Sequence, residues 1–271
     1  MALYLQSNSS ALVAENYFNQ SQMQINQSFT QLSSGYRINS AADDAAGLGI
    51  AKSMNAQVQS YSVASQNAND AISMVQTADG SADQIDDLLT RMRELAVEAQ
   101  NGTMNSDDQA NLQTEFGQDM SEIDRVSGDA TFNGATLLAG TSTTISFQVG
   151  INGTTNDQIA VTFGGCDCSG LGISSTLAVT SSGVLSTIDT AMQTLDNNRA
   201  GFGAAMNRLQ DASNQISSTQ TNLSSALSTI QDVDVASATA NLAREQVLAQ
   251  AGASVLSQAN QAPQLALKLL Q

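Results

Sequence analysis

Several residue types are missing or scarce in this chain of 271 residues. It has no histidine, no tryptophan and a single proline, Pro263. Without histidine the chain lacks the commonest general base and the commonest metal ligand, together with every motif that needs them, such as the HExxH zinc site. The lack of histidine does not exclude enzymatic chemistry, but it removes its commonest residues. We predict no catalytic residues, no cofactor and no metal, and a protein that is not an enzyme.

Cysteine is also scarce, because Cys166 and Cys168 are the only two. One residue separates them, so a disulfide between them would be strained, and no disulfide framework is possible. Two thiolates supply only half of a tetrahedral metal site. We expect both to be small apolar residues that are partly buried, or contacts between copies of the chain.

Basic residues are few, with 9 Lys and Arg against 25 Asp and Glu and a formal net charge of −16. Such a surface repels phosphate backbones and anionic lipid, so we expect neither nucleic acid nor a membrane as a partner. The N-terminus has neither the basic nor the apolar region of a signal peptide. A secreted form would therefore need another export route.

Aromatic residues make up only 4% of the chain, although 41% of it is hydrophobic, with much of that share alanine. A composition poor in proline and aromatics and rich in alanine favours long helices that meet along thin seams. Apolar residues recur every seven positions at the start of the chain, at Tyr4, Ala11, Phe18, Ile25 and Leu32. From about residue 44 to residue 100 the same spacing forms two rows, Tyr61, Ala68, Val75, Ala82, Leu89 and Ala96, and Ala64, Ala71, Ala78, Ile85, Met92 and Ala99.

A third helix is predicted to start at Asn105, a favourable N-cap, and to end near Gly128. From about residue 131 to residue 183 the chain is instead rich in Gly, Ser and Thr. Two alternating runs, 144–149 and 158–163, flank Asn152-Gly153 and predict a β-hairpin.

The longest pattern lies in the last third of the chain. Its row contains Ile188, Leu195, Phe202, Leu209, Ile216, Leu223 and Ile230. The row changes phase after residues 232–234 and continues through Leu242 and Leu256, and we expect Pro263 to end the helix. A sustained seven-residue repeat predicts coiled-coil packing. The predicted fold is mainly α with a small β-hairpin region, a long antiparallel coiled-coil or helical-bundle rod.

The two ends of the chain are almost free of charge. Glu15 is the only charged side chain in residues 1–36, and Lys268 is the only one in residues 246–271. Faces of Gln, Asn and Ser can be buried without the cost of desolvating an unpaired ion. We therefore expect both ends to be covered by each other and by further copies of the chain. The alternative is a monomeric antiparallel bundle with a polar, weakly charged exterior.

Several motifs resemble those of the bacterial flagellins. Residues 31–48, QLSSGYRINSAADDAAGL, are similar to the N-terminal signature of that family, and QAG at 250–252 with LSQANQAPQ at 256–264 is similar to its closing signature. Further blocks follow in the family's order: NAND at 67–70, RMRELAV at 91–97, EIDRV at 122–126 and FNG at 132–134. One departure is that Leu227 and Thr229 stand where flagellins usually carry arginines.

The resemblance implies a subunit that polymerises into the flagellar filament for swimming and is exported unfolded by the flagellar type III apparatus to the cell exterior. Residues 1–42 and 234–271 would form the inner coiled-coil tube. Residues 43–183 and 184–233 would form the surrounding shell. A hook–filament junction protein is the alternative.

Partners and contact residues follow from the same resemblance. The partners are other copies of the chain, the hook-associated and cap proteins, and an export chaperone on the C-terminal helix. A flagellin-sensing Toll-like receptor is a further candidate partner, with Arg91, Leu95 and Glu115 as its contact; the alternative is that Arg91 and Glu115 are ordinary partners between helices. The predicted subunit-packing seam consists of Phe18, Ile25, Leu32, Leu195, Phe202, Leu209, Ile216, Leu223, Ile230, Leu242 and Leu256.

Overall fold

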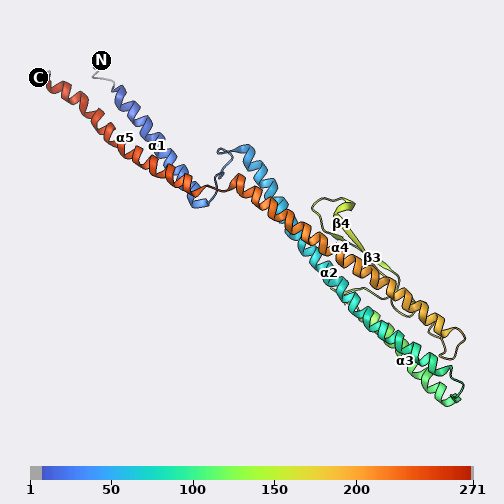
Figure 1. Ribbon diagram of the computed structural model, residues 1–271. Coiled ribbons are helices and arrows are strands. Elements are labelled where there is room, and N and C mark those ends of the chain that lie inside the picture. The colour runs from blue at the N-terminus through green and yellow to red at the C-terminus, as the bar shows by residue number, and fades with distance from the viewer. Residues whose placement is uncertain (1–7, 270–271) are drawn as a thin grey trace. The chain divides into compact units, whose positions relative to one another are not determined.

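The computed structural model describes residues 8–269, so Tyr4 of the first predicted row lies outside the described residues. The chain forms two compact units. Unit 1 comprises Met1–Ala56 and Asn222–Gln271, and unit 2 comprises Gln57–Thr221. The elements are α1 (Ser9–Ser34), α2 (Ala45–Ala99), α3 (Ser106–Asp129), β1 (Thr131–Phe132), β2 (Ala135–Thr136), β3 (Thr143–Gln148), the 3₁₀ turn η1 (Thr155–Asp157), β4 (Gln158–Phe163), α4 (Val184–Gln231) and α5 (Val235–Leu269) (Figure 1).

In unit 2, the helix pairs run antiparallel. Arg93 of α2 pairs with Asp189 of α4, while Asp79, four turns earlier on α2, pairs with Arg199, later on α4. A turn at Asn101-Gly102 leads from α2 into α3. Asn105 caps α3 by accepting bonds from the amides of Asp107 and Asp108, as the sequence predicted.

The core of unit 2 confirms the seven-residue rows. Every member of the two α2 rows is buried except Tyr61, which is half-buried. The α4 row is buried from Ile188 to Ile216 and becomes half-buried at Leu223 and Ile230. Many of the α2 members are alanines, which let neighbouring helices approach closely. The core therefore follows from periodicity, as expected for helices that meet along thin seams.

The predicted hairpin is present as β3 and β4, which pair antiparallel from Thr143 opposite Phe163 to Gln148 opposite Gln158. Figure 1 shows it beside α4. Its inner face packs on the helices, because the Phe163 ring lies 5.6 Å from the Phe202 ring and Gln148 accepts a hydrogen bond from Asn67 of α2. The smaller pair β1–β2 was not predicted; its turn uses Asn133 and Gly134, both at positive φ.

In unit 1, α1 and α5 lie side by side and antiparallel. The Asn8 side chain donates to the Ala259 carbonyl near the start of α1, and Phe18 lies against Gly252. At the other end, α1 stops at Gly35, whose φ of 77° suits glycine. The amide of Val233 donates to the Gly35 carbonyl, and Tyr36 and Asp232 form an isolated β-bridge.

One expectation about the helix ends is wrong. Pro263 does not terminate the last helix, because α5 continues to Leu269. Proline removes one backbone donor from a helix and strains the preceding turn, but it does not always break the helix. The change of phase after residue 232 does coincide with a break, since α4 ends at Gln231 and α5 starts at Val235.

Candidate functional site

Large apolar side chains that are exposed gather in unit 1. Among the side chains that the structure describes, only Val63 and Val97 of this kind belong to unit 2. Those on α1 and α5, called here the exposed apolar set, are Leu12, Val13, Tyr17, Met23, Phe29, Val235, Val247, Leu248 and Val255. Tyr17 and Val247 are the most open, at 67% and 69% exposed. Exposed apolar side chains that gather on one pair of helices are typical of a protein interaction site.

Part of this set lines a groove between α1 and α5. The groove has a volume of about 310 Å³ and is lined by Ala14, Tyr17, Phe18, Ser21, Leu248, Ala251, Gly252 and Val255. Small residues make room for it, because Ala14, Ala251 and Gly252 fill little of the space between the two helices. No charged side chain lines the groove. Its lining suits an apolar side chain of a partner.

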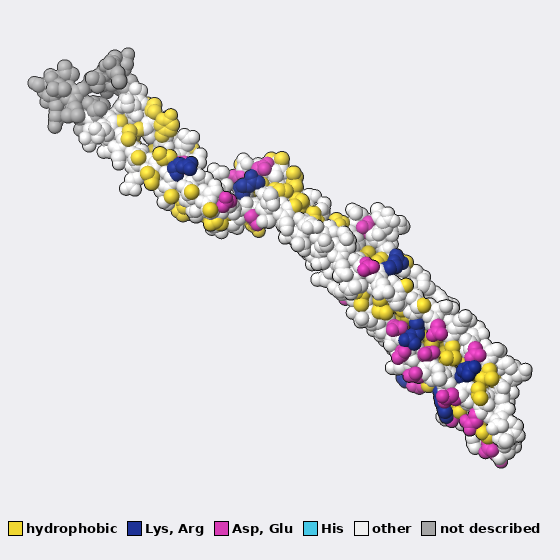
Figure 2. Space-filling view, in the orientation of Figure 1, with side chains coloured by type: hydrophobic (Ala, Val, Ile, Leu, Met, Phe, Trp, Pro, Cys, Tyr) yellow, Lys and Arg dark blue, Asp and Glu magenta, His cyan; other side chains and the backbone are white. Residues whose placement is uncertain are grey.

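Charge is distributed in the opposite way. Every ion pair found among the described residues joins side chains of unit 2. In Figure 2 the acidic and basic side chains are densest over the helices of unit 2, and fewer of them show along α1 and α5, where hydrophobic side chains are visible. Helices α1 and α5 contain few charged residues, namely Glu15, Arg244, Glu245 and Lys268, so most of their surface can lose water without desolvating an ion.

The residues of the predicted seam fall into two groups. Leu195, Phe202, Leu209 and Ile216 are buried in the core of unit 2, where they pack within their own chain. In unit 1, Ile25 is buried, and the remaining members are half-buried: Phe18, Leu32, Leu223, Ile230, Leu242 and Leu256. That these residues pack between subunits stays a prediction.

The exposed apolar set was missed by the analysis of the sequence. A signal for it was present, since several members directly precede a row position: Tyr17 before Phe18, Leu248 before Ala249 and Val255 before Leu256. Apolar residues beside a row widen the apolar face beyond what one partner helix covers. Only the three-dimensional pairing of α1 with α5 shows which of them remain open.

The three candidate receptor contacts all belong to unit 2, but they differ in exposure. Arg91 bonds Glu115 of α3 at 2.6 Å and Glu94 at 3.1 Å, and these hydrogen bonds raise the pKa of Arg91. Leu95, by contrast, is fully buried. Near the pair, Asp119 has a buried Oδ2 with no hydrogen-bond partner, and burial, followed by the charge of Glu115, raises the pKa of Asp119.

An acidic cluster surrounds Arg199 of α4. Its guanidinium lies 2.8 Å from Asp83, 3.3 Å from Asp79 and 3.8 Å from Asp86, all on α2. Burial, and then the nearby charge of Asp196, raises the pKa of Asp86. Arg199 of α4 thus neutralises three carboxylates that would otherwise repel one another along the face of α2 that meets α4.

Within residues 8–269, no group of three or more Cys, Asp or Glu side chains is placed to hold a metal ion. In the same part of the chain, no helix has the length and apolarity needed to span a membrane.

Sequence comparisons identify the family. Residues 5–143 match the bacterial flagellin N-terminal helical region, and residues 185–270 match the bacterial flagellin C-terminal helical region. Together the two matches cover most of the chain. The chain belongs to the bacterial flagellin family. The stretch between the two regions, residues 144–184, contains the β3–β4 hairpin and both cysteines.

Complete flagellins are among the relatives. The chain is 39% identical over 247 residues to a flagellin of Halalkalibacterium halodurans, covering 89% of each protein. It is 36% identical to a flagellin of Xenorhabdus nematophila over the full length of both. It is also 32% identical to the flagellar filament 33 kDa core protein of Treponema phagedenis, over 99% of this chain and 100% of that one.

Membership of this family makes the chain a structural subunit of the flagellar filament, a short form without large outer domains. Flagellins polymerise into an extracellular filament. No observation favours the alternative of a hook–filament junction protein.

Proposed function

We propose that unit 1 is the part of this flagellin that packs between copies in the filament, and that the exposed apolar set and its groove are the contact. The observation that carries the proposal is the concentration of exposed apolar side chains on α1 and α5, where ion pairs are absent among the described residues. In this proposal residues 1–42 and 234–271 form the inner tube, and residues 43–183 and 184–233 form the shell.

The energetics favour assembly through this surface. Full burial of one Val, Leu, Phe or Met side chain contributes about 1.5–3 kcal/mol. Several such side chains on each copy, repeated through a polymer, outweigh the entropy that is lost when a subunit is fixed in place. The seam residues that are half-buried in the single chain, such as Leu242 and Leu256, would complete their burial at the same contact.

A charge in the groove tests the proposal. Leu248→Asp in the full-length chain should abolish seeded filament growth, seen by negative-stain electron microscopy, because the new carboxylate would be desolvated without a partner. Leu248→Met is the matched control and should polymerise. Thermal unfolding of unit 2 should be the same in both variants, since residue 248 lies in unit 1. Filaments of normal length from Leu248→Asp would refute the proposed contact.

We also propose that the chain is exported unfolded by the flagellar type III apparatus and is held beforehand by an export chaperone on α5. The exposed Val247, Leu248 and Val255 give such a chaperone an apolar helix face to cover. Binding of the chaperone and of a second copy would then exclude each other. A chaperone pull-down with the Leu248→Asp variant tests this: capture equal to that of the unmodified chain would count against it.

The remaining proposals concern partners and chemistry. Hook-associated and cap proteins would meet the same unit 1 surface at the filament ends.

For a flagellin-sensing Toll-like receptor, Arg91 and Glu115 supply the exposed charges, and Leu95 would support them from beneath because it is buried. Arg91→Ala should then weaken receptor signalling. We propose that the chain carries out no enzymatic reaction, as befits a structural family.

A further inference from the structure

Both cysteines lie in a tightly packed loop of unit 2 that the filament contact does not use. Cys166 is fully buried, and Cys168 is 5% exposed. Both are free thiols. The loop is fixed by backbone bonds, since the Cys166 amide donates to the Leu138 carbonyl at 2.7 Å and the Cys168 amide donates to the Asp124 carboxylate at 2.9 Å.

The two sulfurs face different helices. Cys166 Sγ donates to the Gly164 carbonyl at 3.3 Å and accepts a bond from Asn198 of α4 at 3.5 Å. Cys168 Sγ donates to the Met120 carbonyl of α3, also at 3.3 Å. Each thiol hydrogen thus bonds a backbone carbonyl, that of Cys166 within the loop and that of Cys168 on α3. A disulfide has no such hydrogens and needs its sulfurs about 2 Å apart.

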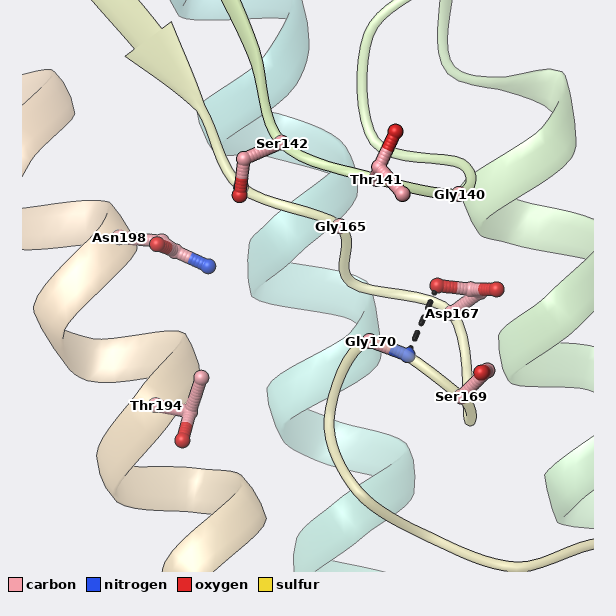
Figure 3. A pocket seen from close by; sticks show the side chains of 10 residues that line it. Gly140, Thr141, Ser142, Gly165, Asp167, Ser169, Gly170, Thr194 and Asn198 are labelled. Carbon is pink, nitrogen blue, oxygen red and sulfur yellow. Dashed lines mark hydrogen bonds between the residues drawn. The ribbon is translucent and has the colours of Figure 1, made fainter.

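The loop is tightly packed on its inner side. A Cβ on Gly164 would lie 2.4 Å from the Asn198 amide, and one on Gly165 would lie 1.9 Å from the Gly140 carbonyl. A polar hollow of about 420 Å³ runs along the outside of the loop (Figure 3), and neither cysteine is among its lining residues. Solvent therefore reaches the backbone of the loop, while the sulfurs stay behind it.

We propose that the Cys166–Cys168 pair makes the folding of unit 2 sensitive to redox conditions: the folded loop excludes a disulfide between the two, and a disulfide formed in the unfolded chain excludes the folded loop. This inference does not depend on the proposed function. Burial raises the pKa of both thiols, that of Cys168 to about 12, which further suppresses the reactive thiolate in the folded state.

The oxidation needs a small-molecule disulfide, such as oxidised glutathione, as the oxidant. The thiolate of one cysteine attacks a sulfur of that disulfide and releases one thiolate. The second cysteine thiolate then attacks the mixed disulfide at the protein sulfur, forming the intrachain S–S bond and releasing a second small thiolate. Two cysteine sulfurs are oxidised, the small disulfide is reduced to two thiols, and the two cysteine protons pass to those thiols.

The experiment uses the purified full-length chain. Treatment with excess oxidised glutathione in guanidinium should give the intrachain disulfide despite the strain that a single intervening residue imposes. Mass spectrometry identifies it as the loss of two hydrogens. The same treatment in native buffer should be slower by at least about a hundredfold, because the thiols are buried and protonated. Equal rates in the two conditions would overturn the proposal.

The second half of the test is refolding. The oxidised chain, returned to native buffer, should leave residues 164–173 open to protease and should unfold at a lower temperature, and added dithiothreitol should restore both properties. The Cys166→Ala/Cys168→Ala variant is the control and should refold equally with or without oxidant. The reversal by dithiothreitol makes the test independent of that variant's stability. An oxidised chain that refolds with an unchanged midpoint of thermal unfolding would be decisive against the inference.

Discussion

In unit 2 the seven-residue rows of α2 and α4 are buried in the core of the chain itself, and Leu89, Phe202 and Leu209 are fully buried. In unit 1 the rows of α1 and α5 pack together only along one edge, and Leu12, Tyr17 and Val247 stay open to solvent. The ion pairs found among the described residues all lie in unit 2. The same repeat thus builds a closed core where α2, α3 and α4 pack together, and it leaves an open surface where α1 and α5 pack as a pair.

The largest expected effect breaks the closed core. Phe202→Ala should lower the free energy of unfolding of unit 2 by about 3–5 kcal/mol, because it leaves a cavity beside the Phe163 ring. Leu242→Ala, in unit 1, should leave unit 2 unchanged. Hydrogen exchange of peptides from residues 184–221 measures both. Similar protection in the two variants would show that the units are not built as differently as described.

A smaller effect is expected from the charge network. Arg199→Met should destabilise unit 2 by about 1–2 kcal/mol, since it leaves Asp79, Asp83 and Asp86 to repel one another. High salt should reduce the loss. Arg208→Met is the control and should cost less than about 0.5 kcal/mol, because Arg208 is exposed and makes no ion pair among the described residues. Urea titrations at low and high salt measure the free energy of unfolding of both variants. An equal loss in Arg199→Met and Arg208→Met would contradict the prediction.

The two helix caps allow a matched comparison between the units. Asn105→Ala should destabilise α3 by about 1 kcal/mol, because Asn105 caps two amides and Asp108 completes the capping box. Asn8→Ala should cost about as much, because Asn8 caps only one amide of α1, that of Ala11 at 3.2 Å, but the variant also loses the bond from Asn8 to the Ala259 carbonyl at 2.8 Å. Hydrogen exchange at the start of each helix gives the two values. A clearly unequal loss at the two helices would contradict the comparison.

The smallest effect depends on pH. Asp119→Asn should stabilise unit 2 at pH 7 by less than about 1 kcal/mol, a value that allows for solvent screening. The pKa of Asp119 is raised in the folded state, so its carboxyl favours folding most below about pH 4 and loses that contribution as the pH rises through the raised pKa. The advantage of the variant should therefore disappear on acidification. Urea unfolding at pH 7 and at pH 3.5 checks the sign.

Periodicity predicted most of the fold. It gave the helix rows, the hairpin strands and the Asn105 cap, because each depends on residues close together in sequence. It could not show that Leu95 is buried, or that the two cysteines, expected to be partly buried, are buried almost completely, since that depends on how α3, α4 and the 164–173 loop pack on one another. The exposed apolar set was missed for the same reason. The prediction that Pro263 ends the last helix was wrong, because the local preference of proline for ending a helix does not outweigh the helical preference of the rest of α5.

The bridge between residues 35–37 and 231–233 has a mechanical consequence. The Arg37 amide donates to the Gln231 carbonyl at 2.7 Å, its guanidinium donates to the Ile230 carbonyl at 2.6 Å, and Val233 donates back to Gly35. These bonds join the two connecting segments side by side. A pull on either segment is shared by both, so that neither stretches alone, which is a useful property in a propeller that must transmit torque without yielding.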